Sequence, residues 1–294
     1  MNPDSRNTIA VIGATGAQGG SVVRALQERG EFRVRALTRN PDGARGLADE
    51  VVAADLTRPE TLGPAFDGAY GVFANTNSFG APDTDEVAQG TAAVAAAKTA
   101  GVQHYIWSTL PNVAEITSGR YNVPHFTNKA KVNAVVENAG FRWFTFVEPP
   151  FYYQNLRSPM YPTHLGPDGT PTLSVPMRPD VRGVHMGDIT ELGNVVAGAF
   201  GQPQTVGEGQ HLSFAGDLLS WDDIVTILSS QGHNLTYSQT SDDPWGIRDM
   251  FAYFEDHTYF GPDADKKIAY ATDVSTKPFT DFATWAKTNM PPPL

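Results

Sequence analysis

The chain has 294 residues, 40% of them hydrophobic and 18% charged, a composition that suits a large folded α/β domain rather than a disordered chain. Its formal net charge of −11 disfavours direct binding to DNA or RNA, which needs a basic surface. The sequence contains no cysteine, so disulfides, thiolate nucleophiles, cysteine-bound zinc and iron–sulfur clusters are excluded.

Short sequence motifs also bear on metal binding and on the location of the protein in the cell. The seven histidines are scattered and form no His-Glu-x-x-His pattern, so we expect no metal site. Residues 1–7 are polar and lack the apolar core of a signal peptide, and no apolar run is long enough to cross a bilayer. We therefore expect a soluble, cytoplasmic protein with no membrane partner.

Strand and helix patterns alternate through the first half of the chain. Strands are expected at residues 8–12, 32–37, 50–54, 69–74, 103–108 and 142–147. Helices are expected at residues 18–29, 57–66, 84–100 and 126–138, the second opened by a capping box of Thr57 and Glu60. Strands separated by helices in this order predict an α/β fold with a parallel, doubly wound Rossmann-type sheet.

The second half changes in character after Val147. Residues 148–179 are rich in proline, tyrosine and glycine and predict loops folded over a site. A strand at 183–186 and a helix at 188–200, opened by Asp188 and Glu191 as a capping box, predict one more strand–helix unit. We therefore expect a dinucleotide-binding domain over residues 1–150, to which residues 183–200 return.

A smaller C-terminal α/β lobe for a substrate or partner is expected within residues 151–294. It is predicted to contain a strand at 211–214, a helix from Trp221 capped by Ser220, and an aromatic helix over 244–257. The aromatic segments 151–153 and 245–260 suit the lining of a pocket for a flat, apolar molecule. The alternative is that most of these aromatic residues belong to the hydrophobic core of the smaller lobe.

Three glycines, Gly13, Gly16 and Gly19, are spaced GxxGxxG between the first strand and the first helix. Glycine is needed here because the chain turns sharply, its backbone approaches a pyrophosphate, and the helix packs closely on the strand. The helix N-terminus then offers unpaired N–H groups to the anion. The flanking strand and helix make this pattern specific for a dinucleotide; a glycine-rich turn without a ligand is the alternative.

The end of the second strand indicates which dinucleotide is bound. An NAD enzyme usually carries a carboxylate there for the ribose hydroxyls, whereas this chain has Thr38 and Arg39. A guanidinium binds a 2′-phosphate through two hydrogen bonds, so we expect NADP(H) rather than NAD(H). Arg33 and Arg35 are interpreted as a solvated strand face. Asp55 is placed to accept from the adenine amino group or serves only as a turn residue.

Six motifs extend from the first strand almost to the C-terminus. They are Val11-Ile-Gly-Ala-Thr-Gly-Ala-Gln-Gly-Gly20, Val34-Arg-Ala-Leu-Thr-Arg-Asn-Pro41, His104-Tyr-Ile-Trp-Ser-Thr-Leu-Pro-Asn112, His125-Phe-Thr-Asn-Lys129, Pro150-Phe-Tyr-Tyr-Gln-Asn-Leu156 and Tyr253-Phe-Glu-Asp-His-Thr-Tyr-Phe-Gly261. Together they resemble the NmrA-like family of atypical short-chain dehydrogenases. The resemblance implies a Rossmann core that carries NADP(H) or NAD(H), with a smaller C-terminal lobe that closes a cleft.

The resemblance also implies the cofactor contacts. They would come from the glycine loop, from the ends of the next strands, and from the nicotinamide side, where Lys129 lies near the ribose and Tyr152 beside the ring. The loop contacts are Gly13, Thr15, Gly16, Ala17, Gln18 and Gly19, and those after the second, third and fourth strands are Thr38, Arg39, Asp55, Leu56, Asn75, Thr76 and Asn77.

A short-chain dehydrogenase combines serine with Tyr-x-x-x-Lys. Ser108 ends the fifth strand, where the serine belongs, and Lys129 is present, but His125 stands where the tyrosine is expected. Histidine titrates near neutrality and Lys129 would do so in a desolvated cleft, so either serves as an acid. In the alternative, His125 caps or packs at the helix start and Lys129 only binds ribose. Tyr152 and Tyr121 are further proton donors.

Three functions remain open. The first is an NADPH-dependent reductase or dehydrogenase acting on a small, aromatic or secondary-metabolite-like substrate. The second is a non-catalytic redox sensor that reports the cofactor ratio to a protein partner. The third is a cofactor-bound enzyme for a non-redox isomerisation or dehydration. Fold alone does not choose between them; the ambiguous feature is the pair His125 and Lys129.

Overall fold

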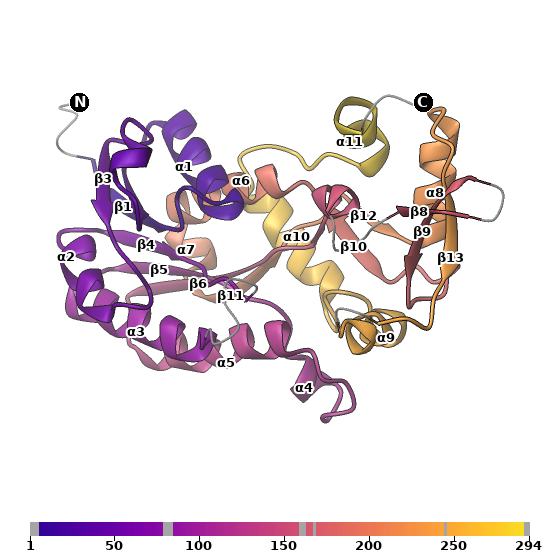
Figure 1. Cartoon of the computed structure of the whole chain (residues 1–294). Coiled ribbons are helices and arrows are strands. Elements are labelled where there is room, and N and C mark those ends of the chain that lie inside the picture. Colours follow the sequence, from indigo (N-terminus) through magenta and orange to yellow (C-terminus); the bar gives the residue numbers. More distant parts are fainter. Residues whose placement is uncertain (1–5, 79–84, 159–162, 167–168, 244–245, 291–294) are drawn as a thin grey trace.

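A computed structural model describes residues 6–78, 85–158, 163–166, 169–243 and 246–290 (Figure 1). Its largest unit is a seven-stranded parallel sheet in the order β11-β6-β5-β4-β1-β2-β3. The strands are β1 (Thr8–Ile12), β2 (Arg33–Thr38), β3 (Glu50–Ala53), β4 (Gly71–Ala74), β5 (His104–Ser108), β6 (Trp143–Glu148) and β11 (Glu208–Ser213). All six strands predicted in the first half are present, and the doubly wound Rossmann-type fold is confirmed.

Helices cover both faces of this sheet (Figure 1). One face carries α1 (Ala17–Arg29), α6 (Leu192–Gly201) and α10 (Ala264–Val274); the other carries α2 (Leu62–Phe66), α3 (Glu86–Thr99) and α5 (Pro124–Asn138). Because the central strands are buried from both sides, their sequences are nearly continuous apolar runs. Because the strands are parallel, the carboxyl ends of β1, β4 and β5 meet at one edge of the sheet. Ligands bind at this edge in such sheets.

Two three-stranded sheets and three longer helices build the second part of the molecule. One sheet has the order β12-β10-β7 and the other β13-β9-β8. The strands are β7 (Phe151–Tyr152), β8 (Thr163–Leu165), β9 (Pro171–Val175), β10 (Val184–Gly187), β12 (Asp217–Leu219) and β13 (Thr236–Gln239). The longer helices are α8 (Trp221–Ser230), α9 (Arg248–His257) and α11 (Phe282–Asn289), and two single-turn helices elsewhere are α4 (Val113–Ile116) and α7 (Pro203–Val206).

The aromatic residues of this part mostly form its core. Phe151, Tyr153, Phe251, Tyr253 and Phe254 are buried in one hydrophobic cluster. The alternative interpretation of the aromatic segments as core therefore holds for these residues, since buried side chains do not line an open pocket.

Two expected strands are present, but each belongs to a different sheet than expected. The strand expected at 211–214 in the smaller lobe is β11, which pairs in parallel with β6 and extends the large sheet. The strand expected at 183–186 is β10, which pairs with β7 and β12 in a separate sheet. Only α6 of that unit returns to the large sheet, where it packs on α1. Pairing of this kind joins residues far apart in sequence, so local patterns do not reveal it.

Neither capping box expected from Thr57 and Asp188 forms, although Asp188 does cap the turn before α6 by accepting from the N–H of Thr190. Thr57 donates its N–H and its hydroxyl to the carboxylate of Asp55. The carboxylate of Glu191 accepts from the N–H and hydroxyl of Thr280, a residue distant in sequence, instead of from the N–H of Asp188. Thr57 therefore bonds to a residue of the preceding turn, and Glu191 bonds to a residue distant in sequence, instead of to a partner within its own helix.

Two other helices predicted from the sequence are present in the structure. The cap of the helix at Trp221 is confirmed, because Ser220 and Asp223 form a reciprocal capping box. The helix expected over 244–257 begins at Arg248, since Gly246 has a φ of +64° that no helix accommodates; its first two expected residues lie outside the described residues. Within the described part of the chain, no helix is both long and apolar enough to cross a membrane.

Candidate functional site

The glycine loop connects β1 to α1 by a turn that only glycine fits. Gly13 has a φ of +67°, and the N–H of Gly16 donates to its carbonyl over 2.8 Å. A Cβ on Gly19 would lie 2.2 Å from that same carbonyl oxygen. The loop surface at Thr15 and Ala17 is exposed, and no side chain caps α1. The N–H groups of its first turn therefore face outward, as a phosphate site requires.

Gly19→Ala is expected to weaken NADPH binding at least tenfold and to lower the free energy of unfolding by about 1–3 kcal/mol, because the backbone of the loop must move. Gly63→Ala is the matched control, since a Cβ there meets nothing within 4 Å inside α2. Urea unfolding and a fluorescence titration measure both effects. Equal behaviour of the two variants would contradict the role of Gly19.

The residues expected at the adenosine end lie at the carboxyl ends of β2 and β3. Thr38 is buried and its hydroxyl accepts from the N–H of Asn40. Arg39 is exposed, and across the described ranges its guanidinium has no hydrogen bond or ion pair. By contrast, Arg33 and Arg35 both bind Glu50, so these two belong to an ion-pair cluster rather than to a freely solvated face.

Asp55 takes part in the turn that follows β3. Its Oδ1 accepts from the N–H and hydroxyl of Thr57, and the Thr57 amide is the largest cause that lowers its pKa, with Arg39 contributing by charge attraction. Leu56 packs against the core beside β3. Arg39 and Asp55 therefore share one end of the sheet, where an adenosine would lie.

At the other end of the loop, Gln18 joins α1 to the end of β5. Its Oε1 accepts from the Ser108 hydroxyl at 2.9 Å. The hydroxyl of Tyr152 is buried, and burial raises its pKa, an effect that the Gln18 side chain opposes. Three residues predicted separately, Gln18, Ser108 and Tyr152, are thus brought together from α1, β5 and β7. The contact between Gln18 and Ser108 spans 90 positions and carries no local sequence signal.

Lys129 lies in the second turn of α5 and is 6% exposed. Its Nζ lies 2.7 Å from the Thr76 carbonyl oxygen, 3.0 Å from the Thr76 hydroxyl and 3.0 Å from the carboxylate of Glu86. Burial lowers the pKa of Lys129, and the charge and hydrogen bond of Glu86 oppose this. The structure therefore joins Lys129 to the loop after β4, where Asn75 is half-buried and Asn77 exposed.

Glu86 is the functional candidate that the sequence analysis missed. It is 3% exposed and accepts hydrogen bonds from the hydroxyls of Thr76 and Ser78, both at 2.7 Å, besides pairing with Lys129. In the sequence it is an acidic residue in the first turn of a helix, after its cap Asp85. Glutamate is common at that position because its negative charge interacts favourably with the helix dipole. The sequence pattern therefore does not indicate that this charge is buried.

His125 packs at the start of α5 but is not its cap, which is Val123. Burial lowers its pKa to about 4, Glu86 acts against this shift, and Lys129 adds to it. Its ring contacts Phe126 edge to face. At neutral pH the imidazole is therefore uncharged, and the expectation that it titrates near neutrality is wrong, because burial disfavours its charged form.

A second cluster surrounds Glu148 at the end of β6. This buried carboxylate lies 2.6 Å from Nδ1 of His211 and 3.2 Å from Nζ of Lys267, and it accepts from Ser213. Burial alone would raise its pKa, but these three partners outweigh burial and hold the pKa at about 2. The cluster joins β6 and β11 to α10 (Ala264–Val274) and so fixes the C-terminal part against the sheet.

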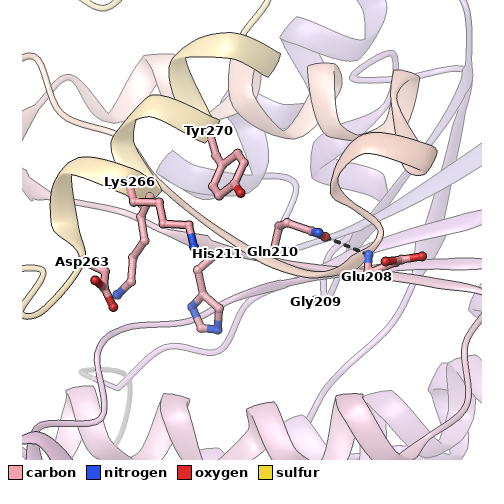
Figure 2. A pocket seen from close by; sticks show the side chains of 8 residues that line it. Glu208, Gly209, Gln210, His211, Asp263, Lys266 and Tyr270 are labelled. Atoms are coloured by element: carbon pink, nitrogen blue, oxygen red, sulfur yellow. Dashed lines mark hydrogen bonds between the residues drawn. The ribbon is translucent and has the colours of Figure 1, made fainter.

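An open cavity of about 440 Å³ lies beside this cluster, between β11 and α10 (Figure 2). Its walls come from residues 208–211 and from Asp263, Lys266, Lys267 and Tyr270. None belongs to the glycine loop or to the Lys129 cluster, so this cavity is separate from the expected cofactor site. Across the described residues, no three histidine, aspartate or glutamate side chains gather in a way that would hold a metal ion.

The seven-stranded parallel sheet and the glycine loop after β1 are those of a Rossmann-type α/β protein. The chain belongs to the NmrA-like family, whose model matches residues 5–286. It is 34% identical over 241 residues to the NmrA-like family domain-containing oxidoreductase FrzB of Cladobotryum sp., a match that covers 74% of this chain and 71% of FrzB. Such relatives support an oxidoreductase in general.

Solved structures share the fold over almost the whole chain. NmrA, a negative transcriptional regulator solved in complex with NAD, has a TM-score of 0.81 at 24% identity and covers 97% of this chain and 96% of its own. Its complex with NADP has a TM-score of 0.79, with the same identity and coverage. Triphenylmethane reductase of Citrobacter sp., complexed with NADP(H), has a TM-score of 0.70 at 19% identity and covers 97% and 100%.

Proposed function

We propose that this protein is an NADP(H)-dependent oxidoreductase that transfers hydride between the cofactor and a small, aromatic or secondary-metabolite-like molecule. Two observations carry the proposal: Ser108 and Tyr152 converge on Gln18 beside the glycine loop, and Lys129 is bonded to Thr76 in the loop after the neighbouring strand β4. The oxidoreductase name of FrzB and the NADP(H) bound by triphenylmethane reductase agree with it.

The residues present fit the cofactor. The loop has no room for a Cβ at Gly19 and presents the uncapped N-terminus of α1 to a pyrophosphate. Arg39 would hold the 2′-phosphate and Asp55 the adenine. Lys129 would exchange one of its Thr76 acceptors for a hydroxyl of the nicotinamide ribose, and Tyr152 would flank the ring.

NADPH, when bound, supplies the hydride that reduces a substrate carbon. The ammonium of Lys129 donates the proton that the adjacent oxygen of the substrate gains, and neutral His125 relays a replacement proton to Lys129. Ser108 donates its hydroxyl to Gln18 in this structure and would turn it to the same oxygen when substrate binds. The C-terminal part steadies this arrangement, because Asp256 of α9 accepts from the Tyr121 hydroxyl just before α5.

One observation favours the redox-sensor function as a second candidate. All three N–H donors of the Lys129 ammonium have an acceptor within the protein, two of them on Thr76. A lysine satisfied in this way is suited to fix the loop after β4, and NmrA itself is described as a regulator. In this case the cofactor would change the affinity for a protein partner without turnover.

NADPH oxidation against a panel of ketones, quinones and enones tests the first function. We expect stoichiometric loss of NADPH with a reduced product for at least one aromatic member. No turnover across the panel, combined with a cofactor-dependent change in the binding of a partner protein, would replace the proposal by the sensor function.

Arg39→Asp is expected to weaken NADPH binding by about tenfold to a hundredfold and NADH binding far less. The substitution replaces a phosphate partner worth roughly 1.5–3 kcal/mol by a repelling charge. Isothermal titration with both cofactors measures the effect. Arg45→Asp is the matched control, because Arg45 is an exposed arginine of the same segment that pairs only with Asp42 among the described residues. Equal affinity of the wild type for the two cofactors would refute the preference.

A further inference from the structure

Glu86 occupies a position that the proposed chemistry does not yet use. It is one of the most deeply buried carboxylates of the described chain, and each of its contacts leads to the Lys129 site. One carboxylate oxygen accepts from the Thr76 hydroxyl and pairs with Lys129, and the other accepts from Ser78. The carboxylate thus connects α3, α5 and the loop after β4.

The opposite charges of Lys129 and Glu86 indicate the role of this contact. A buried ammonium without a partner loses its proton readily, because the low dielectric disfavours the charged form. Glu86 provides the compensating charge at 3.0 Å, while the Thr76 oxygens provide the remaining acceptors. Trp107 covers the side toward β5, with its ring centre 5.8 Å from Nζ of Lys129. The ammonium is therefore both kept charged and fixed in direction.

We propose that Glu86 is the positioning residue of this site: it keeps Lys129 protonated and directs its ammonium toward the loop at Thr76, where the nicotinamide ribose would lie. This inference rests on the proposed function, because it takes Lys129 to contact the cofactor. Glu86 itself acts through Lys129 and touches neither cofactor nor substrate.

In the described part of the chain, few titratable groups face Lys129, so its change of charge can be followed separately from theirs. Among the residues the structure describes, the titratable groups that face it are Glu86 from α3 and His125 from its own helix. Trp107 from β5 and Thr76 from the loop are uncharged. The pKa of His125 is lowered to about 4, and a 2′-phosphate has a second pKa of about 6. Burial lowers the pKa of Lys129 from its ordinary value, so Lys129 is the group of this site whose change of charge the experiment follows.

The experiment measures the Kd for NADPH by fluorescence from about pH 7 to 10, the range up to the ordinary lysine pKa. It uses the wild type, Lys129→Met, Glu86→Gln and the double variant. We expect wild-type affinity to fall as Lys129 loses its proton and the Lys129→Met and double variants to show no such fall. Glu86→Gln should move the fall to lower pH by about 1–3 units, because an opposing charge at this distance shifts a pKa by that amount.

A control separates this effect from the loss of any buried carboxylate. Glu191→Gln removes a buried carboxylate that is bonded to Thr280 and has no contact with Lys129, and it should leave the pH profile unchanged. A profile of Glu86→Gln identical to the wild type, with a flat profile for Lys129→Met, overturns the inference and leaves the proposed function standing. A flat wild-type profile equal to that of Lys129→Met shows that Lys129 does not contact the cofactor and overturns both.

Discussion

Lys129→Met is expected to slow hydride transfer by about a hundredfold to ten-thousandfold, the usual cost of losing a proton-transfer group. Cofactor binding should fall much less, because a ribose contact to a charged group is worth roughly 1.5–3 kcal/mol. Methionine keeps the length of the side chain and removes its charge. Single-turnover oxidation of NADPH with a substrate found in the panel, compared with the Kd for NADPH, separates the two effects.

The same substitution leaves Glu86 buried without its cation, a change that costs about 3–5 kcal/mol of stability. The double variant Lys129→Met with Glu86→Gln removes both charges and should recover much of this loss without recovering turnover. Circular dichroism and urea unfolding check the fold of both proteins. Normal turnover by a folded Lys129→Met protein would show that another group, His125 or Tyr152, donates the proton.

Glu148→Gln is expected to lower the free energy of unfolding by about 3–5 kcal/mol near neutral pH. The substitution keeps the shape of the side chain but leaves Lys267 and His211 facing a neutral amide in a buried site. Glu208→Gln on the neighbouring strand β11 is the matched control, because that side chain is exposed. Urea unfolding of the two variants and the wild type measures the difference.

The pH dependence of this difference has a definite sign. The pKa of Glu148 is held at about 2 in the folded protein, below the ordinary value of 4.5. A carboxylate with a depressed pKa stabilises the fold fully above its unfolded-state pKa, and this stabilisation is lost as the pH falls through the folded-state value. The gap between wild type and Glu148→Gln should therefore shrink from about pH 4.5 to pH 2. A gap that stays constant over this range would exclude ionised Glu148 as its source.

Local patterns were sufficient for the first half of the fold. Each buried parallel strand is an apolar run that its own sequence reveals. The loop after β1 favours glycine because Gly13 has a positive φ and a Cβ at Gly19 would meet the backbone. The capping box of Ser220 and Asp223 was equally visible, since all its partners lie within one helical turn. In such cases the interacting groups are neighbours in the chain.

The sequence by itself determined the Rossmann fold, the cofactor loop and the NmrA-like resemblance, because these depend on short-range spacing and residue size. Only the tertiary structure decided that β11 joins the large sheet, that Gln18 holds Ser108, and that a buried Glu86 pairs with Lys129. The physical reason is that a charge or hydrogen-bond donor tolerates burial only beside its partner. When that partner lies tens of residues away, the chain must fold before the pair exists.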